Sequence, residues 1–402
     1  MRTSEEIYHR VCWDPRFDPA RFALGIAERR AEPVRIPLPD FVPGGEIPWH
    51  RVLFIEADGE VVWDRTTGTD RIDASDAGRV RDTRRLRAPF FAARTPYVWD
   101  AAAGWGPADR ASGAASPVAG LRVLTWDTLG DRYGGARIDL ARRRRLLLAI
   151  LDDADVDVIA LQDVEPELLA LLSRTRWVRA GYTLSTDPVG RDIADSGLLL
   201  LSRLPVREAG WHLLNPQRAV VAIVVDTLAG PLVVATTLLT GDRSDDGPDR
   251  RLAELTQLAE GLAGVEGDLI LLGDFNVGGD GAAGPAAALG LWDAWTEVHG
   301  PRDRTPTLDP RVNPLAAASA PSGRAARLDR VLLRAGAHGT DGCRATRAAL
   351  RGNAPTLEGM YPSDHYGVEV DLSLGGHRPA GRLRQADDPR DLRGAAQPDQ
   401  WT

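Results

Sequence analysis

The sequence predicts a mixed α/β fold with a small α+β domain at its N-terminal end. Over residues 121–374, short apolar runs of strand length alternate with segments whose leucines recur at helical spacing. Two of these runs, 219–226 and 232–239, are joined by only a short turn, so they must pair antiparallel. The sheet is therefore mixed and is not a simple repeat of βαβ units.

Four segments follow one another along the chain. Residues 1–78 form the small domain, in which an Asp-Gly pair between two apolar runs over 50–65 predicts a β-hairpin. Residues 79–120 are rich in Arg, Ala, Gly and Pro without periodicity, which is typical of an interdomain linker. Residues 121–374 form the α/β domain, and residues 375–402 have little to bury, so we expect a mobile tail.

The α/β domain contains two clear helical patterns and eight expected strands. The helices cover 139–153 and 248–262, where leucines lie on one face opposite polar residues. A Pro-rich loop over 305–315 forms either a wall of the substrate site or an ordered structural loop. The strands have apolar composition and strand length, and they cover 121–127, 156–162, 197–202, 219–226, 232–239, 268–274, 328–334 and 367–372.

Composition and charge limit the functions that the chain can have. Its 402 residues carry a net charge of −8, so any nucleic-acid contact must come from a local patch and not from the global charge. Cys12 and Cys343 lie far apart in sequence, which leaves no basis for a disulfide framework or a structural zinc site. The first residues lack the apolar core of a signal peptide, and the longest apolar runs are too short to span a bilayer. We therefore expect a cytoplasmic protein that makes no membrane contact.

Carboxylates occur at the ends of several expected strands. Asp127, Asp163 and Asp274 follow apolar runs, and Asp364 precedes another. Strand ends hold side chains rigidly at one rim of a sheet, so these oxygen ligands can converge there. Converging carboxylates repel one another unless a cation lies among them, and Mg²⁺ or Mn²⁺ prefers oxygen ligands. The pattern therefore predicts a divalent-metal site.

Two local motifs add catalytic chemistry to this prediction. In GDFN, Asp274 and Asn276 can point to the same side of a strand end, where one accepts a proton from water and the other holds it. In SDHYG, His365 follows Asp364 and can stabilise phosphoryl charge if a carboxylate holds it as an imidazolium; Asp329 is the candidate. Either motif alone is also compatible with an ordinary turn or helix cap. Their joint occurrence on strand ends favours the catalytic interpretation.

At these motifs the sequence resembles the endonuclease/exonuclease/phosphatase superfamily, whose fold is DNase I-like. The resemblance covers residues 121–374 and depends on LRVLTWDTL, VIALQDVE, GLLLLSRLP, VVATTLL, LLGDFN, RLDRVLL and PSDHYGV, in family order. It implies a four-layer α/β sandwich of two packed mixed sheets flanked by helices. It also implies an active site at one rim that cleaves phosphate esters with a divalent metal.

The same resemblance assigns roles to individual residues. Asp274 and Asn276 would hold and activate the nucleophilic water. His365, oriented by Asp329, would contact the scissile phosphate. The positions implied for metal binding are Asp127, Asp163 and Asp364.

Three departures from the family pattern affect these roles. Asp127 stands where the family usually has Asn, and Asp163 stands where it usually has Glu. Leu238 replaces the family histidine that would donate to the phosphate. Losing one such preorganised donor costs on the order of 3 kcal/mol, unless Thr237 or Thr240 partly substitutes for it. The site is therefore expected to be either slow or degenerate.

The N-terminal domain resembles the MJ1316-type RNA cyclic group end recognition domain. The resemblance depends on YHRVCWDP, IPLPDFVPGGEIPWHRVLFI and VVWDR. The side chains of His9, His50, Arg51 and Arg65 have the chemistry to bind phosphate, and we expect RNA-end contacts from them. The tryptophans offer stacking surfaces for a base, at Trp13, Trp49 or Trp63. The alternative is that the tryptophans form a core and the charged residues form its rim.

Together these features predict a divalent-metal-dependent phosphoesterase of the nuclease or phosphodiesterase type. RNA is the expected partner and substrate, at ends that arise in repair or processing, with Mg²⁺ or Mn²⁺ as cofactor. Two alternatives stay open: a catalytically impaired RNA-end binding module or scaffold, which Leu238 suggests, and a phosphatase of small molecules.

Overall fold

The computed structural model divides the chain into two compact units, Met1–Arg84 and Arg85–Thr402. The expected tail at 375–402 lies outside the described residues. The structure describes residues 2–14, 16–28, 33–79, 84–108, 118, 120–130, 138–190, 192–227, 230–242, 245–279, 284–320, 322–334 and 343–374.

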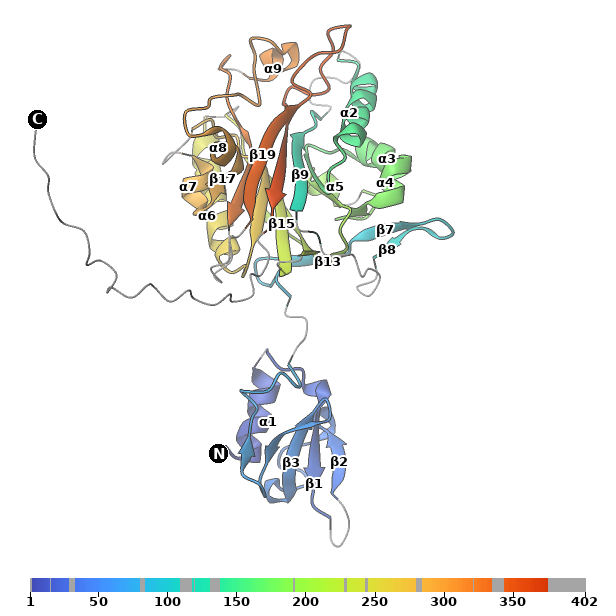
Figure 1. Ribbon diagram of the computed structural model, residues 1–402, viewed down its shortest axis with the longest axis vertical. Coiled ribbons are helices and arrows are strands. Elements are labelled where there is room, and N and C mark those ends of the chain that lie inside the picture. Colours follow the sequence, from blue (N-terminus) through green and yellow to red (C-terminus); the bar gives the residue numbers. More distant parts are fainter. Residues whose placement is uncertain are drawn as a thin grey trace, which may run out of the picture. The chain divides into compact units, whose positions relative to one another are not determined.

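The N-terminal unit packs one helix against a five-stranded antiparallel sheet of order β2-β1-β3-β4-β5 (Figure 1). Helix α1 (Ser4–Trp13) begins at a capping box, in which Thr3 and Glu6 each accept a hydrogen bond from the other's backbone N–H. The expected hairpin joins β3 to β4, where Asp58 and Gly59 have φ of 50° and 82°, as a two-residue hairpin turn requires. The other elements are β1 (Phe22–Ile26), β2 (Val34–Pro37), β3 (Val52–Ala57), β4 (Glu60–Asp64), β5 (Thr69–Asp70), η1 (Pro19–Arg21), η2 (Leu38–Asp40) and η3 (Trp49–Arg51).

The C-terminal unit contains two large mixed sheets. In both, one pair of strands is parallel, β9 with β10 in the first sheet and β15 with β16 in the second. The first sheet has the order β19-β20-β9-β10-β12-β11-β7-β8, with β7 (Tyr97–Asp100), β8 (Gly104–Pro107), β9 (Gly120–Asp127), β10 (Val158–Gln162), β11 (Thr183–Leu184), β12 (Leu199–Ser202), β19 (Arg344–Arg351) and β20 (Gly367–Ser373). The second has the order β17-β18-β16-β15-β14-β13-β6, with β6 (Ala92–Arg94), β13 (Val206–Asn215), β14 (Arg218–Thr227), β15 (Gly230–Leu238), β16 (Leu269–Asp274), β17 (Trp292–Asp293) and β18 (Asp329–Arg334).

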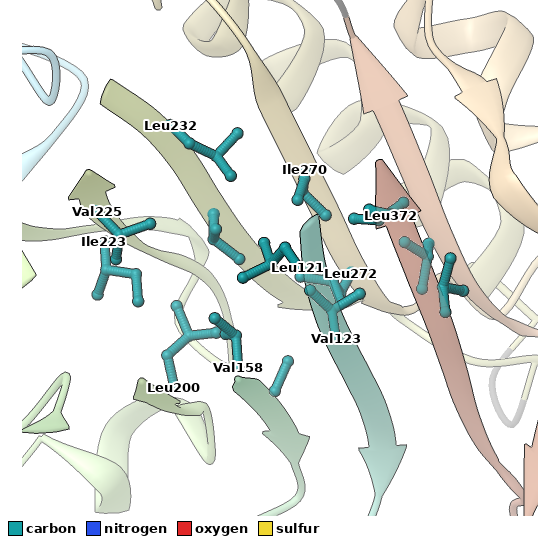
Figure 2. Packing of buried hydrophobic residues seen from close by; sticks show 14 of the residues in the cluster. Leu121, Val123, Val158, Leu200, Ile223, Val225, Leu232, Ile270, Leu272 and Leu372 are labelled. Atoms are coloured by element: carbon teal, nitrogen blue, oxygen red, sulfur yellow. The ribbon is translucent and has the colours of Figure 1, made fainter. Parts of the chain in front are cut away.

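The two sheets pack face to face and helices cover their outer faces. Between the sheets, side chains such as Val123 and Val158 of the first sheet meet Ile223 and Ile270 of the second (Figure 2). Separate apolar clusters join α2, α3 and α4 to the first sheet and α6 to the second, on opposite sides of the unit (Figure 1). This arrangement confirms the predicted four-layer sandwich. The helices are α2 (Leu140–Ala154), α3 (Pro166–Arg174), α4 (Arg176–Gly181), α5 (Ile193–Ser196), α6 (Gly247–Ala263), α7 (Pro285–Leu289), α8 (Ala294–His299) and α9 (Pro314–Ser319).

All eight expected strands are present, and the antiparallel pairing of β14 with β15 is confirmed. Strands β13 and β19 were not expected from the sequence. In β19, which lies at the edge of its sheet, Ala348 is the single buried residue and arginines occupy much of the remainder. An edge strand with so little buried surface lacks the apolar run by which strands are recognised.

The structure also differs from the linker expected at 79–120. Its described part carries three short strands, and β6 extends one large sheet while β7 and β8 extend the other. Strands β7 and β8 form a hairpin that two tryptophans attach to the neighbouring helices. Trp105 Nε1 donates to the carbonyl of Ser173, and the guanidinium of Arg179 lies 4.0 Å from the ring centre of Trp99. Isolated aromatic residues among Ala, Gly and Pro give no periodicity, so the sequence pattern did not predict these strands.

Two further expectations concern the membrane and the cysteines. Within the described residues, no helix is both long and apolar enough to cross a membrane. Cys12 and Cys343 are both free thiols.

Candidate active site

Strand ends from both sheets bring the predicted residues to one rim of the sandwich. Asp127 ends β9, whereas Asp274 ends β16 of the other sheet. Asp329 begins β18 as the antiparallel partner of Asp274, and His365 lies just before β20. The rim is hollowed by a pocket of about 630 Å³, a volume typical of ligand sites. Its walls include Asp127, Asp163, Asp274, Asn276, Asp364 and His365.

A buried amide joins the two sheets beneath this pocket. Gln162, the last residue of β10, donates from Nε2 to the hydroxyls of Thr125 on β9 (3.1 Å) and Thr236 on β15 (2.9 Å). All three side chains are fully buried. The bond to Thr236 therefore crosses from one sheet to the other and fixes the distance between the two walls of the site.

Close strand packing shapes the GDFN turn. Gly273 has φ of 146°, and a Cβ at this position would lie 2.0 Å from the carbonyl oxygen of Thr237 on β15, so only glycine fits. Asp274 then points into the pocket, where Asn276 binds it from both its backbone N–H (2.8 Å) and its Nδ2 (2.7 Å). Asn276 Nδ2 also donates to the carbonyl of Leu239. The two motif residues are thus held together as the sequence predicts.

Three pocket residues other than glycine have left-handed backbone conformations. Leu129, Asp163 and Asn276 have φ of 57°, 58° and 52°. This conformation is costly for a leucine and clusters at functional sites when the surrounding structure imposes it. At Leu129 the backbone N–H donates to Asp127 Oδ1 (3.1 Å), so the turn holds the Asp127 carboxylate.

His365 forms a buried pair with Asp329. His365 Nδ1 lies 2.8 Å from Asp329 Oδ2, which leaves the other ring nitrogen for the pocket. Burial alone would lower the pKa of His365, but the charge of Asp329 and its hydrogen bond outweigh burial. The pKa is therefore raised well above its usual range. The raised pKa favours the imidazolium form of the ring, which is suited to stabilising a phosphoryl group.

Asp127, Asp274 and His365 each present one ligand atom, and these atoms lie within 4.8 Å of one another. Burial, with repulsion from Asp329 and Asp127, raises the pKa of Asp274 to about 7 although His365 opposes the shift. The carboxylates of Asp127 and Asp274, which come from different sheets, therefore lie close together without enough positive charge to compensate them. A divalent cation would supply that charge, and the oxygen donors fit Mg²⁺ or Mn²⁺.

The structure places the remaining predicted metal positions in the same pocket but outside this group of three. Asp163 Oδ2 accepts a hydrogen bond from the backbone N–H of Gly130 (3.2 Å). Asp364 Oδ1 accepts a hydrogen bond from the hydroxyl of Ser363 (3.2 Å). The same hydroxyl donates to the backbone carbonyl of Asp127. The tight cluster therefore contains Asp127 from the predicted metal set and Asp274 from the predicted catalytic set.

Residues of the Pro-rich loop support the site, and sequence reasoning did not identify them individually. Asn313, fully buried, donates to the carbonyls of Ser363 (2.9 Å) and Asp364 (3.3 Å). The hydroxyl of Thr307 accepts from the backbone N–H of Asp329 (3.1 Å). The loop therefore braces both motif segments from behind, which favours the structural interpretation of 305–315. The only sequence signal for Asn313 and Thr307 is that each is a polar residue within a Pro-rich stretch.

Leu238 lies in the pocket wall with 3% of its surface exposed. Neither neighbouring threonine supplies the donor that leucine lacks, because Thr237 donates to the carbonyl of Ala219 and Thr240 donates to Glu254. Sequence analysis missed the basic residues of the pocket, since arginine is abundant along the whole chain. They are Arg218, Arg250 and Arg324.

In the N-terminal unit, all four predicted RNA-end residues lie in or beside η3, which contains His50 and Arg51. The His9 ring centre lies 6.5 Å from that of Trp49, and Arg65 donates to the carbonyls of Trp49 and His50. The guanidinium of Arg51 donates to the carbonyl of Ala27.

The tryptophans of this unit differ in exposure. Trp13 is 82% exposed, whereas Trp49 is half-buried against Phe41. The stacking role suggested for Trp63 is wrong, because its ring is buried and its Nε1 donates to the carbonyl of Arg2.

The fold and this rim define a DNase I-like α/β sandwich with an acidic pocket. A family model described as "Endonuclease/Exonuclease/phosphatase family" matches residues 124–365, and the "MJ1316 RNA cyclic group end recognition domain" matches residues 1–65. Because the first match covers more than half of the chain, the protein belongs to the endonuclease/exonuclease/phosphatase family.

Two solved structures of D. rerio TDP2 show the same fold at low sequence identity. TDP2 from D. rerio, complexed with single-strand DNA product, is 20% identical with a TM-score of 0.52, over 63% of this chain and 99% of that one. A humanized D. rerio TDP2 with 14 mutations is 19% identical with a TM-score of 0.51, over the same shares. Sphingomyelinase C from Streptomyces griseocarneus is 20% identical with a TM-score of 0.49, also over 63% and 99%.

Proposed function

We propose that the protein is a divalent-metal-dependent phosphodiesterase that acts on RNA, at ends that arise during repair or processing. The observation that carries the proposal is the cluster of Asp127, Asp274 and His365, with His365 bound to Asp329. A metal-dependent phosphoesterase needs carboxylates, one to hold the ion and one to accept the proton of water, and a cation for the phosphoryl group. This cluster supplies both within one pocket.

Each residue has a defined task in the proposed reaction. Asp274, with a pKa raised to about 7, accepts the proton of a water that Asn276 helps to hold. His365 donates from its free ring nitrogen to the phosphate. Asp127, joined by Asp163 and Asp364 directly or through water, would hold Mg²⁺ or Mn²⁺, which supplies Lewis-acid stabilisation of phosphoryl charge.

RNA is the proposed substrate because the chain also carries a domain of the RNA-end recognition family. Within it, we assign the end contacts to His9, His50, Arg51 and Arg65, with the first two most available because neither side chain is held by a backbone carbonyl in the hydrogen bonds described above. The D. rerio TDP2 structure with single-strand DNA product supports a polynucleotide substrate, and DNA is therefore the comparison substrate.

Release of product from RNA oligonucleotides with defined ends, measured with and without Mg²⁺, tests the activity. Asp274→Ala and His365→Ala should each lower the rate about a hundredfold or more. Asp226→Ala is the control, because Asp226 pairs with Arg207 near the end of β14 away from the rim. Unchanged rates in the two site variants would refute the assignment.

The role of the N-terminal unit needs a separate measurement. His9→Ala combined with His50→Ala should weaken binding to RNA with a cyclic phosphate end several-fold. Arg35→Ala, an exposed residue on β2 that pairs with Glu56, is the matched control. Equal binding by both variants would remove RNA-end recognition from the proposal.

One observation favours a second function, that of an RNA-end binding scaffold with little turnover. The phosphate-facing end of β15 carries Leu238, and the hydroxyls of Thr237 and Thr240 are used elsewhere. Robust turnover by the natural chain excludes this function.

A further inference from the structure

A second groove of about 510 Å³ adjoins the catalytic pocket. The two hollows share Asn215, Gln217 and Arg250 in their walls, so they form one continuous depression. The groove lies between the turn that joins β13 to β14 and the exposed side of α6. None of the catalytic residues described above contributes to its walls.

The groove is held in shape by a buried carboxylate. Glu254 on α6 is 2% exposed and accepts hydrogen bonds from Asn215 Nδ2 (2.6 Å) and from the backbone N–H of Thr240 (2.8 Å). Asn215 Oδ1 in turn accepts from the backbone N–H of Gln217 (2.8 Å). One residue thus ties the helix, the turn and the end of β15 together, so the groove is preformed next to the pocket.

The chemistry of the walls is that of a site for a nucleobase. Leu214, Pro216 and Ala253 present apolar surface, and the amides of Gln217 and Gln257 can donate to and accept from a base edge. Apolar surface combined with convergent amides suits a flat heterocycle with polar edges. The single acid in the walls, Glu254, is already bound, so it adds little repulsion toward a polynucleotide.

Arg250 lies where the groove meets the catalytic pocket, which suits the phosphate group that joins two nucleotides. Its guanidinium pairs with Asp246, in an exposed ion pair one helical turn away (2.6 Å). Exposed pairs of this kind contribute little, so the guanidinium can exchange this partner for a phosphate at small cost.

From this continuity and lining we infer that the groove is a subsite for the nucleoside joined to the scissile phosphate. The inference rests on the proposed function, because it assumes that the phosphate lies in the catalytic pocket. It adds the place where the base beside the reacting phosphate binds, which a small phosphate ester without a base would leave empty.

Filling the groove tests the inference. Ala253 is exposed in the groove wall, so Ala253→Trp should block a base without disturbing the core, and Leu252→Trp on the neighbouring, exposed helix position is the matched control. The measurement is the ratio of KM for a short RNA to KM for bis(p-nitrophenyl) phosphate, which has no nucleoside. Ala253→Trp should raise this ratio about tenfold or more, because the base would lose its buried contacts with the groove, and Leu252→Trp should not.

A second variant and a binding assay separate the possible failures. Gln257→Ala, which only shortens a side chain, should raise the same ratio several-fold. If the ratio stays within twofold in both groove variants, the subsite is refuted while the activity stands. If the natural chain cleaves neither substrate, the proposed function fails, and RNA binding by fluorescence anisotropy decides the subsite. Weaker binding in Ala253→Trp than in Leu252→Trp then supports it, and equal binding overturns it.

Discussion

His365 Nδ1 lies 2.8 Å from Asp329 Oδ2, and Asp329 is the cross-strand partner of Asp274. The residue that orients the histidine and the proposed base therefore face each other on adjacent strands. Burial is the main reason why the pKa of Asp274 is raised, and the charge of Asp329 adds to this effect. The same charge raises the pKa of His365 against the effect of burial. The site is an electrostatic unit, and removing one member should change the others.

Replacing Asp329 by asparagine should lower the pKa of His365 toward its usual value. The imidazolium would then be lost as pH rises through neutrality, whereas in the natural chain it persists to higher pH. We expect kcat to fall about a hundredfold or more at pH 8 and much less at pH 5.5. The pH-rate profile and NMR titration of the His365 ring provide the measurement. An unshifted histidine titration would contradict the predicted coupling.

The Asp274→Asn variant should be more stable than the natural chain when no metal is present. The folded pKa of Asp274 is raised to about 7, above its usual value of 3.8. Its contribution to stability is therefore present in acid and is lost as pH rises from about 4 through about 7. At pH 8 we expect the variant to gain about 0.5–2 kcal/mol in the free energy of unfolding, and this gain should vanish near pH 4.

Urea denaturation at both pH values, with EDTA present, measures this difference. Adding Mg²⁺ should stabilise the natural chain more than the variant, because an ion held by Asp127 would attract the nearby charged carboxylate of Asp274. A variant that is less stable at pH 8, or a gain that persists at pH 4, would contradict the argument.

The strand ends of the site were predictable because their signals are local. An apolar run that stops at Asp127 or Asp274 marks both a buried strand and the rim at which it ends. Asn313 and Thr307 had no such signal, because their roles depend on loops that meet only after folding. The tight grouping of Asp127 with Asp274 was also beyond the sequence, since it depends on the spacing of two packed sheets.

Replacing Leu238 by histidine should raise the turnover of the natural chain. The new ring would restore a donor at the end of β15 that Thr237 and Thr240 do not supply, and a donor of this kind contributes about a hundredfold in kcat. Because Leu238 is nearly buried, the variant should also lose about 2–3 kcal/mol of stability. Leu238→Ala is the control, since it removes the same packing without adding a donor. A similar rate in both variants would show that the position does not contact the phosphate.

Arg330 supports the turn that follows the GDFN motif, although it lies outside the pocket. Its Nη1 donates to Asp293 Oδ2 (2.7 Å), and its Nη2 donates to the carbonyls of Val277 and Gly279 (3.2 and 2.9 Å). Both charged side chains are nearly fully buried. Within the described part of the chain, Arg330→Met would leave the Asp293 carboxylate paired with the more distant Arg327 alone, at 3.8 Å.

This poorly compensated buried charge should lower the free energy of unfolding by about 3–5 kcal/mol. Urea denaturation should show the loss as a lower midpoint. Arg330→Met combined with Asp293→Asn removes the unpaired charge together with its partner, so it should recover part of that stability. Neither variant restores the bonds to Val277 and Gly279, so kcat should stay low in both even where the protein is folded. Full recovery of kcat in the double variant would mean that Arg330 acts only by balancing the charge of Asp293 and does not position the turn beside Asp274.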